Sequence, residues 1–140
     1  KVFKEIFEIN FFSQNLFICP PHASQITALA ALDAKEELDQ NVIVYKKNRE
    51  ILLEELPKAG FTTFSPPDGA FYIYVDISKF SNDSLNFCKR VLEESGVAIT
   101  PGLDFDQNRG SNTIRFSYAR STENIIEGAR RIKEFMLKNY

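Results

Sequence analysis

The chain has 140 residues, 44% of them hydrophobic and 26% charged, a composition typical of one globular domain with its own core. Its formal net charge is −2, which provides no basic surface for a nucleic acid or an anionic membrane. No apolar run approaches the roughly 20 residues that a membrane-spanning helix needs. We therefore expect neither a nucleic-acid nor a membrane partner.

The cysteines and the single histidine argue against a metal site. Cys19 and Cys88 are far apart and form no CxxC unit, which is typical of a reduced, cytoplasmic protein. With His22 as the only histidine, they cannot form a zinc site of ordinary spacing. Motifs for a nucleophilic serine, a phosphate-binding loop or a dinucleotide site are absent as well. The sequence predicts no metal-binding residue.

The first third of the chain is apolar and lacks an obvious packing partner. Residues 1–17 carry Phe and Ile at helical spacing, which predicts a helix with one very apolar side. After Pro20-Pro21, the small-residue run 26–32 predicts a short buried helix. The chain also does not begin with Met, so we expect it to be a piece of a longer protein.

A long helix follows, with a capping box predicted from Asp33 and Glu36 and an end predicted at Pro57 and Gly60. Its expected inner stripe consists of Leu38, Val42, Tyr45, Leu52 and Leu56. Two strands are then predicted, 61–64 and 70–77, separated by a turn. In the second strand, Phe71, Ile73 and Val75 should share one face, and Tyr72, Tyr74 and Asp76 the other.

The C-terminal part alternates helices and strands. A helix over 84–95 should end at Gly96, with Leu85, Cys88, Val91 and Leu92 facing inward. Strands are predicted over 97–100 and 113–118, joined by a loop. Ser121 should cap the last helix, whose inner stripe is Ile125, Ala129, Ile132 and Met136. The expected fold class is α+β, a small mixed sheet flanked by helices.

Arg115 is the side chain in these strands whose chemistry best suits a ligand. It alternates with Ile114 and Phe116, and a guanidinium on a rigid strand can bind a carboxylate through two parallel hydrogen bonds. On the pattern alone, an edge-strand arginine that pairs with a glutamate or faces water is the commoner case. The turns at Pro101-Gly102 and at 67–70 are equally ambiguous.

Taken in order, several segments resemble the class I and II aminotransferases, pyridoxal-phosphate enzymes of fold type I. The matching segments are Ser24-Gln25, Tyr45, Asn48-Arg49, Gly60-Phe61, 67–72, 96–102 with Phe105, and 114–119. Each is weak alone, but the ordered set over roughly residues 14–137 is specific. The resemblance implies that residues 33–140 are the C-terminal small domain. Residues 1–32 would be the end of the large domain and the crossover segment.

The resemblance also implies a function. The full-length enzyme would transfer an amino group between an amino acid and a 2-oxo acid, with pyridoxal phosphate as cofactor. Arg115 would bind the α-carboxylate of the substrate, and the loop after Pro101-Gly102 would border the substrate entrance. The partners implied are the missing N-terminal large domain and a second subunit in a homodimer. Asn48 and Arg49 would be structural.

The lysine that forms the Schiff base in this family has no counterpart here. Ser78-Lys79 is the only Ser-Lys pair, but it follows the main strand of the small domain and its flanking residues do not match. We therefore expect no catalytic and no cofactor-binding residue in this chain, which should neither bind the cofactor nor be active alone.

Other functions stay open from the sequence. A lyase or decarboxylase of the same family would use the same arginine, and the domain could also be a stand-alone, non-catalytic α+β binding module. An RNA-binding sheet built on Phe71, Tyr72 and Tyr74 is disfavoured by the charge. The sequence leaves the amino donor and the oxo acid undetermined.

Overall fold

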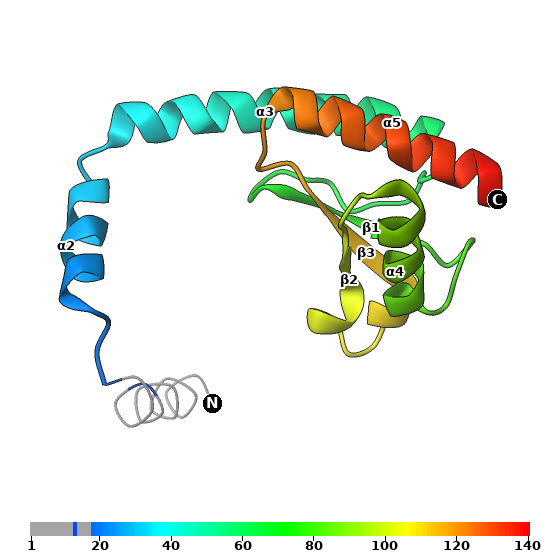
Figure 1. Ribbon diagram of the computed structural model, residues 1–140, viewed down its shortest axis with the longest axis horizontal. Helices are drawn as coiled ribbons and strands as arrows, with labels where there is room; N and C mark the ends of the chain where they lie inside the picture. Colours follow the sequence, from blue (N-terminus) through cyan, green and yellow to red (C-terminus); the bar gives the residue numbers. More distant parts are fainter. Residues whose placement is uncertain (1–12, 14–17) are drawn as a thin grey trace. The chain divides into compact units, whose positions relative to one another are not determined.

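The computed structural model describes residue 13 and residues 18–140 (Figure 1). The helix predicted over 1–17 lies outside the described residues. The chain divides into two compact units, Lys1–Gln40 and Asn41–Tyr140. The sheet and the candidate site both belong to the second unit.

Helix α2, His22–Ala31, follows the proline pair directly. It begins four residues earlier than predicted, and its start is held by hydrogen bonds from the backbone N–H of Gln25 to Pro21 O and from Gln25 Nε2 to Pro20 O. None of its residues is buried. The expectation of a buried helix is therefore wrong for this chain, because the described residues supply no cover for its apolar side chains.

Helix α3, Lys35–Lys58, confirms the long helix but not its predicted ends. The predicted capping box is not formed in the described part of the chain, because the helix starts at Lys35, two residues after Asp33. Pro57 lies inside the last turn and does not end the helix; the chain turns away at Gly60, whose φ is +96°. Leu52 and Leu56 of the predicted stripe are buried, whereas the stripe's first residues, Leu38 and Val42, are exposed.

Three antiparallel strands form the sheet, in the order β1-β3-β2: β1 is Tyr72–Asp76, β2 is Thr100–Pro101 and β3 is Thr113–Ser117. The strand predicted over 61–64 is reduced to a single bridge between Phe64 and Val75. The strand predicted over 97–100 is also shorter than expected. The α+β class is confirmed.

The register of β1 and β3 separates two faces of the sheet. Ile73 lies opposite Phe116 and Val75 opposite Ile114, and all four side chains are buried. Fully burying a side chain of this kind stabilises the fold by about 1.5–3 kcal/mol. Tyr72, Tyr74 and Arg115 alternate with these residues, so they lie on the other face.

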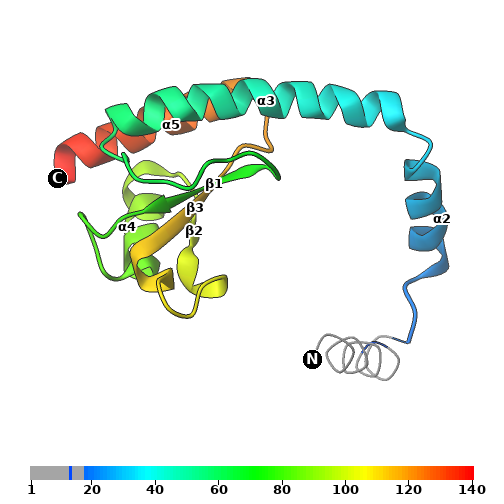
Figure 2. The same ribbon diagram turned by 180° about the vertical axis from the view of Figure 1, so that it is seen from behind.

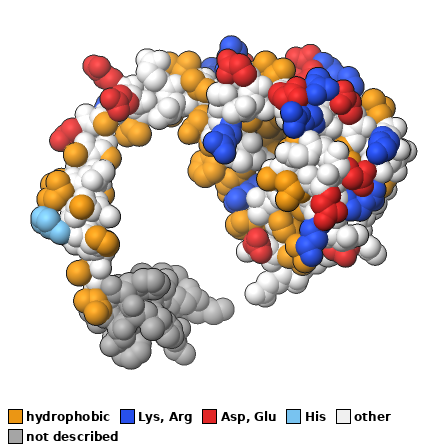
Figure 3. Space-filling view, in the orientation of Figure 1, with side chains coloured by type: hydrophobic (Ala, Val, Ile, Leu, Met, Phe, Trp, Pro, Cys, Tyr) orange, Lys and Arg blue, Asp and Glu red, His pale blue; other side chains and the backbone are white. Residues whose placement is uncertain are grey.

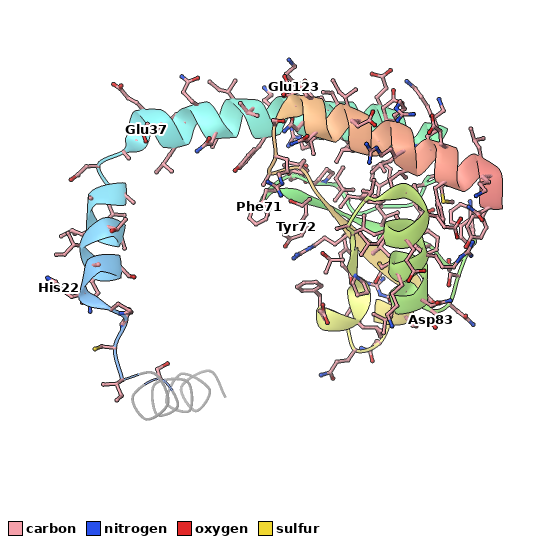
Figure 4. The ribbon with its side chains drawn as sticks, in the orientation of Figure 1. His22, Glu37, Phe71, Tyr72, Asp83 and Glu123 are labelled. Atoms are coloured by element: carbon pink, nitrogen blue, oxygen red, sulfur yellow. The ribbon has the colours of Figure 1, made fainter. Side chains whose placement is uncertain are left out.

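Helices α4, Ser84–Ser95, and α5, Thr122–Asn139, pack against each other (Figure 1). Seen from behind, the sheet lies nearer the viewer than α4 (Figure 2). Asp83 and Ser121 cap the two helices through bonds from the N–H groups of Asn86 and Asn124. Asp83 and Glu123 mark the two helix starts in Figure 4.

The inner face of α5 is as predicted, and that of α4 is as predicted only for Cys88 and Val91. All four residues of the predicted α5 stripe are buried. In α4, Phe87 is buried beside Cys88 and Val91, whereas Leu85 and Leu92 are exposed. The inward face is therefore rotated toward Phe87, because the core favours an aromatic ring at that position.

Aromatic rings fill much of the core. The Phe61 ring lies 5.6 Å from Phe80, 6.4 Å from Phe87 and 5.5 Å from Phe116, each in an edge-on arrangement. The Tyr140 ring lies 5.3 Å from that of Phe80, so the last residue also packs on this cluster.

We predict that the two cysteines react very differently with iodoacetamide at pH 8. Cys88 is buried and burial raises the pKa of its thiol to about 11, so little thiolate exists at this pH. Cys19 is exposed. Intact-mass measurement should show one adduct on the native chain and two in guanidinium chloride. Equal labelling rates for both thiols in the native chain would contradict the packing of α4.

Candidate functional site

Arg115 lies on β3, the central strand, with a register partner on each side. Tyr74 of β1 and Thr100 of β2 are its partners, so its side chain emerges on the face opposite the buried Ile114 and Phe116. A central strand is held on both edges by ladder hydrogen bonds. The base of this arginine is therefore fixed by the sheet.

Two aromatic rings cover the guanidinium. Its Cζ atom lies 4.8 Å from the centroid of the Tyr72 ring and 4.3 Å from that of the Phe105 ring. Both distances are within the range of favourable cation–π contact. Tyr72, labelled with Phe71 in Figure 4, belongs to strand β1, whereas Phe105 belongs to the loop between β2 and β3. Rigid strand and loop thus contribute one ring each.

The guanidinium has no polar partner among residues 18–140. Its Nε atom is buried without a hydrogen-bond acceptor, and no ion pair joins it to a described carboxylate. Four other arginines do pair with carboxylates: Arg90, Arg109, Arg130 and Arg131. A buried, unsatisfied N–H is costly and calls for a partner. Arg115 is therefore equipped to bind an external anion.

The loop that carries Phe105 folds on its own hydrogen bonds. The N–H groups of Phe105 and Asp106 both donate to Gly102 O, at 2.9 and 3.0 Å. The Asp106 carboxylate accepts from the N–H groups of Arg109 and Asn108, which hold the pKa of Asp106 below its usual value. These bonds define where Phe105 stands, although its side chain is 54% exposed.

Gly102 brings this loop into close contact with the sheet. Its carbonyl accepts from Tyr74 Oη at 3.4 Å, and Tyr74 Oη accepts from Thr113 Oγ1 at 2.9 Å. A Cβ atom on Gly102 would overlap Thr113 Oγ1 and lie 2.8 Å from Tyr74 Oη. Only glycine allows this contact.

Asn48 and Arg49 fasten α3 to one end of the β1–β3 pair, where β1 begins and β3 ends. The Nδ2 of Asn48, which is fully buried, donates to Tyr118 O at 3.0 Å and to Arg120 O at 2.7 Å. Arg49 Nη1 donates to Pro67 O at 3.1 Å, in the turn before β1. Both residues therefore hold backbone in place.

Lys79 lies apart from this arrangement. It is exposed in the turn after β1, and its Nζ donates to Thr62 Oγ1 at 3.4 Å. The structure therefore shows Lys79 as a surface side chain bonded to Thr62.

A cavity of about 590 Å³ in the described part of the chain does not include Arg115. It is bounded by α3, α5 and the segment 96–99, and its lining is largely apolar. Acidic and basic side chains are intermingled over α4 and α5 on the face that Figure 3 shows, with no one-signed patch. Size alone does not make this cavity the site. Of its two arginines, Arg131 pairs with Glu127 and Arg120 is exposed, whereas Arg115 has a buried Nε atom without an acceptor.

The described part of the chain has neither a candidate metal cluster nor a candidate membrane-spanning helix. No group of three or more His, Cys, Asp or Glu side chains there is placed to hold a metal ion. Nor does any described helix combine the length and hydropathy that crossing a bilayer demands.

Comparison with known proteins decides the family. The model of the family "Aminotransferase class I and II" matches residues 9–132. The chain belongs to this family. It is 45% identical over 124 residues to the valine–pyruvate aminotransferase of Mycobacterium tuberculosis, covering 87% of this chain and 32% of that protein. The resemblance found in the sequence is thus confirmed.

Solved structures agree with the class I and II assignment. The fold matches a Silicibacter pomeroyi protein assigned as an aminotransferase with a TM-score of 0.82 at 55% identity, over 96% of this chain and 36% of that one. It matches an aminotransferase from Mycobacterium tuberculosis with a TM-score of 0.80 at 42% identity, over 93% of this chain and 34% of that one. The chain spans about a third of the length of the curated relatives it matches.

Sequence reasoning selected Arg115 in this aminotransferase chain but missed its two covering rings. Tyr72 could have been found, because it lies on the same strand face as Tyr74, the register partner of Arg115. Phe105 carried no such signal, because a loop with short 3-10 turns has no periodicity from which side-chain direction follows.

We predict that Gly102→Ala destabilises the chain by about 1–3 kcal/mol, because the new methyl group overlaps Thr113 and Tyr74. Gly128→Ala is the matched control: nothing lies within 4 Å of the added methyl group, and this helical site should gain about 0.5–1 kcal/mol. Urea unfolding measures both. A Gly102→Ala variant as stable as the wild type would contradict the close approach of loop and sheet.

Proposed function

We propose that this chain is the substrate-binding, closing part of a pyridoxal-phosphate-dependent aminotransferase that transfers an amino group between an amino acid and a 2-oxo acid. In this proposal residues 33–140 are the C-terminal small domain, and residues 1–32 are the end of the large domain and the crossover segment. Arg115 binds the α-carboxylate of either substrate. The full-length enzyme is a cytoplasmic homodimer.

The observation that carries the proposal is the unsatisfied guanidinium of Arg115. It stands on a central strand, its Nε is buried without an acceptor, and two aromatic rings lie within cation–π distance of it. A carboxylate would supply the missing acceptors in the planar geometry that a guanidinium prefers. Both substrates of a transaminase carry such a carboxylate, so one arginine can serve both halves of the reaction.

The cofactor chemistry belongs to the part of the protein outside this chain. Pyridoxal phosphate, when bound by the family's full-length enzymes, acts as the electron sink for the amino-acid carbanion. The exposed Lys79 and its surroundings do not fit that group. This chain's own contribution is to bind and orient the substrate carboxylate.

We predict that pyruvate and alanine bind this chain at Arg115, whereas alaninamide, which lacks the carboxylate, does not. Two-dimensional ¹H–¹⁵N NMR of the arginine Nε–Hε groups measures this directly, because a buried Nε–H exchanges slowly with water. Arg115→Gln should weaken pyruvate binding about tenfold or more, as expected for loss of a charged hydrogen-bond partner.

Arg120→Gln is the control for this measurement. It removes the same charge from an exposed side chain three residues after the end of β3, and it should leave pyruvate binding unchanged. Equal losses in both variants would mean that net charge, and not the site at Arg115, attracts the anion. That result would refute the assignment of Arg115.

We predict further that the chain alone has no transaminase activity and forms no stoichiometric adduct with pyridoxal phosphate after borohydride reduction. The physical reason is that no lysine accompanies the carboxylate site. Intact-mass measurement followed by peptide mapping tests it. A single adduct at one lysine would show that the cofactor site extends into this chain, and Lys79→Arg would then be the first variant to test.

A further inference from the structure

The Tyr72 and Phe105 rings both lie within cation–π distance of the guanidinium and restrict how a ligand can approach it. The Cζ atom lies 4.8 Å from the centroid of the Tyr72 ring and 4.3 Å from that of the Phe105 ring. No described side chain occupies the donors with a hydrogen bond or an ion pair. Two parallel hydrogen bonds require the oxygens of an anion to lie in the guanidinium plane, in the space beside the two rings, which we call the slot.

A slot of this kind distinguishes anions by shape. A carboxylate is flat, so both of its oxygens can lie in the guanidinium plane and accept two parallel hydrogen bonds. Phosphate and sulfate are tetrahedral. When two of their oxygens occupy that plane, the other two project above and below it, and an oxygen that meets the apolar Phe105 ring loses water and gains no donor.

We propose that Phe105 is a specificity-determining residue that makes the Arg115 site select planar carboxylates over tetrahedral oxyanions. The inference rests on the proposed function, because it takes the same carboxylate site as its starting point. Phe105 acts by position: its ring orients the guanidinium and closes one side of the slot. Tyr72 closes the slot from strand β1, which the β3 ladder fixes.

Phe105 is the residue beside the slot that can be substituted without disturbing the core. Its ring is held over Arg115 by the hydrogen-bonded turn 102–106, not by burial, and the side chain is half exposed. A substitution there should therefore leave the core intact. The loop that bears the ring also begins at Gly102, whose contacts with Thr113 and Tyr74 set its height above the sheet.

The test compares pyruvate and inorganic phosphate, each titrated into the 140-residue chain with the Nε–Hε signal of Arg115 as the readout. The ratio of the two dissociation constants is measured for the wild type, Phe105→Leu, Phe105→Met and Phe105→Tyr. Comparing ratios removes the effect of the different charges of the two anions. Thermal unfolding of each variant confirms that it is folded.

The wild type should prefer pyruvate, and Phe105→Leu and Phe105→Met should each lower that preference about three- to tenfold, within the strength of one cation–π contact. Phe105→Tyr should retain the preference, because it keeps the flat ring. Leu103→Ala is the matched control, an exposed apolar residue on the same loop, and should behave as wild type.

The outcomes separate this inference from the function on which it rests. An unchanged ratio in Phe105→Leu and Phe105→Met, with pyruvate still bound, would overturn the role of Phe105 and leave Arg115 as the carboxylate site. Absence of any Arg115 response to pyruvate in the wild type would overturn both. A loss of preference in Leu103→Ala equal to that in Phe105→Leu would also overturn it, since the loop as a whole would then be responsible.

Discussion

The pairing of β1 with β3 is the constraint on which the rest of the structure depends. Placing Ile73 opposite Phe116 and Val75 opposite Ile114 buries four apolar side chains against the helices. The same register places Tyr72, Tyr74 and Arg115 together on the other face. A shift by one residue would bury the arginine and expose the core. The hydrophobic effect therefore fixes the position of the candidate site, although no site residue takes part in the core.

Fixing the strand is not enough to prepare Arg115 for a ligand, because its side chain is long and could adopt many rotamers. The loop 102–110 supplies the second half of the arrangement. Its glycine approaches the sheet so closely that no side chain fits, and its turn places the Phe105 ring over the guanidinium. The site is thus assembled from a strand whose position the core determines and a loop whose position backbone hydrogen bonds determine.

The arrangement of the candidate site is compatible with a domain that acts together with another part of the protein. Arg115, Tyr72 and Phe105 all lie within residues 41–140, and Lys79 is exposed and bonded to Thr62. The apolar side chains of α2 and of the first half of α3 stay exposed in this chain. Their hydrophobicity is understandable if the longer protein covers them, as expected for a chain spanning a third of its relatives.

The sequence by itself determined the elements with strong local signals. Period-2 alternation located β1 and β3, Gly96 ended α4, Ser121 capped α5, and the inner stripe of α5 was correct in all four residues. These features depend on neighbours in the sequence. The ordered motifs also identified the family. The side-chain chemistry of Arg115 made this residue the candidate for binding a ligand.

Only the tertiary structure decided the features that arise from distant contacts. Which residues of α4 face inward, how far the edge strands extend and which part of the α3 stripe is buried all depend on what packs against them. The covering of Arg115 by Tyr72 and Phe105 joins residues 33 positions apart, one on a strand and one in a loop. No local pattern encodes that proximity, because it follows from strand register and from the close approach of Gly102 to the sheet.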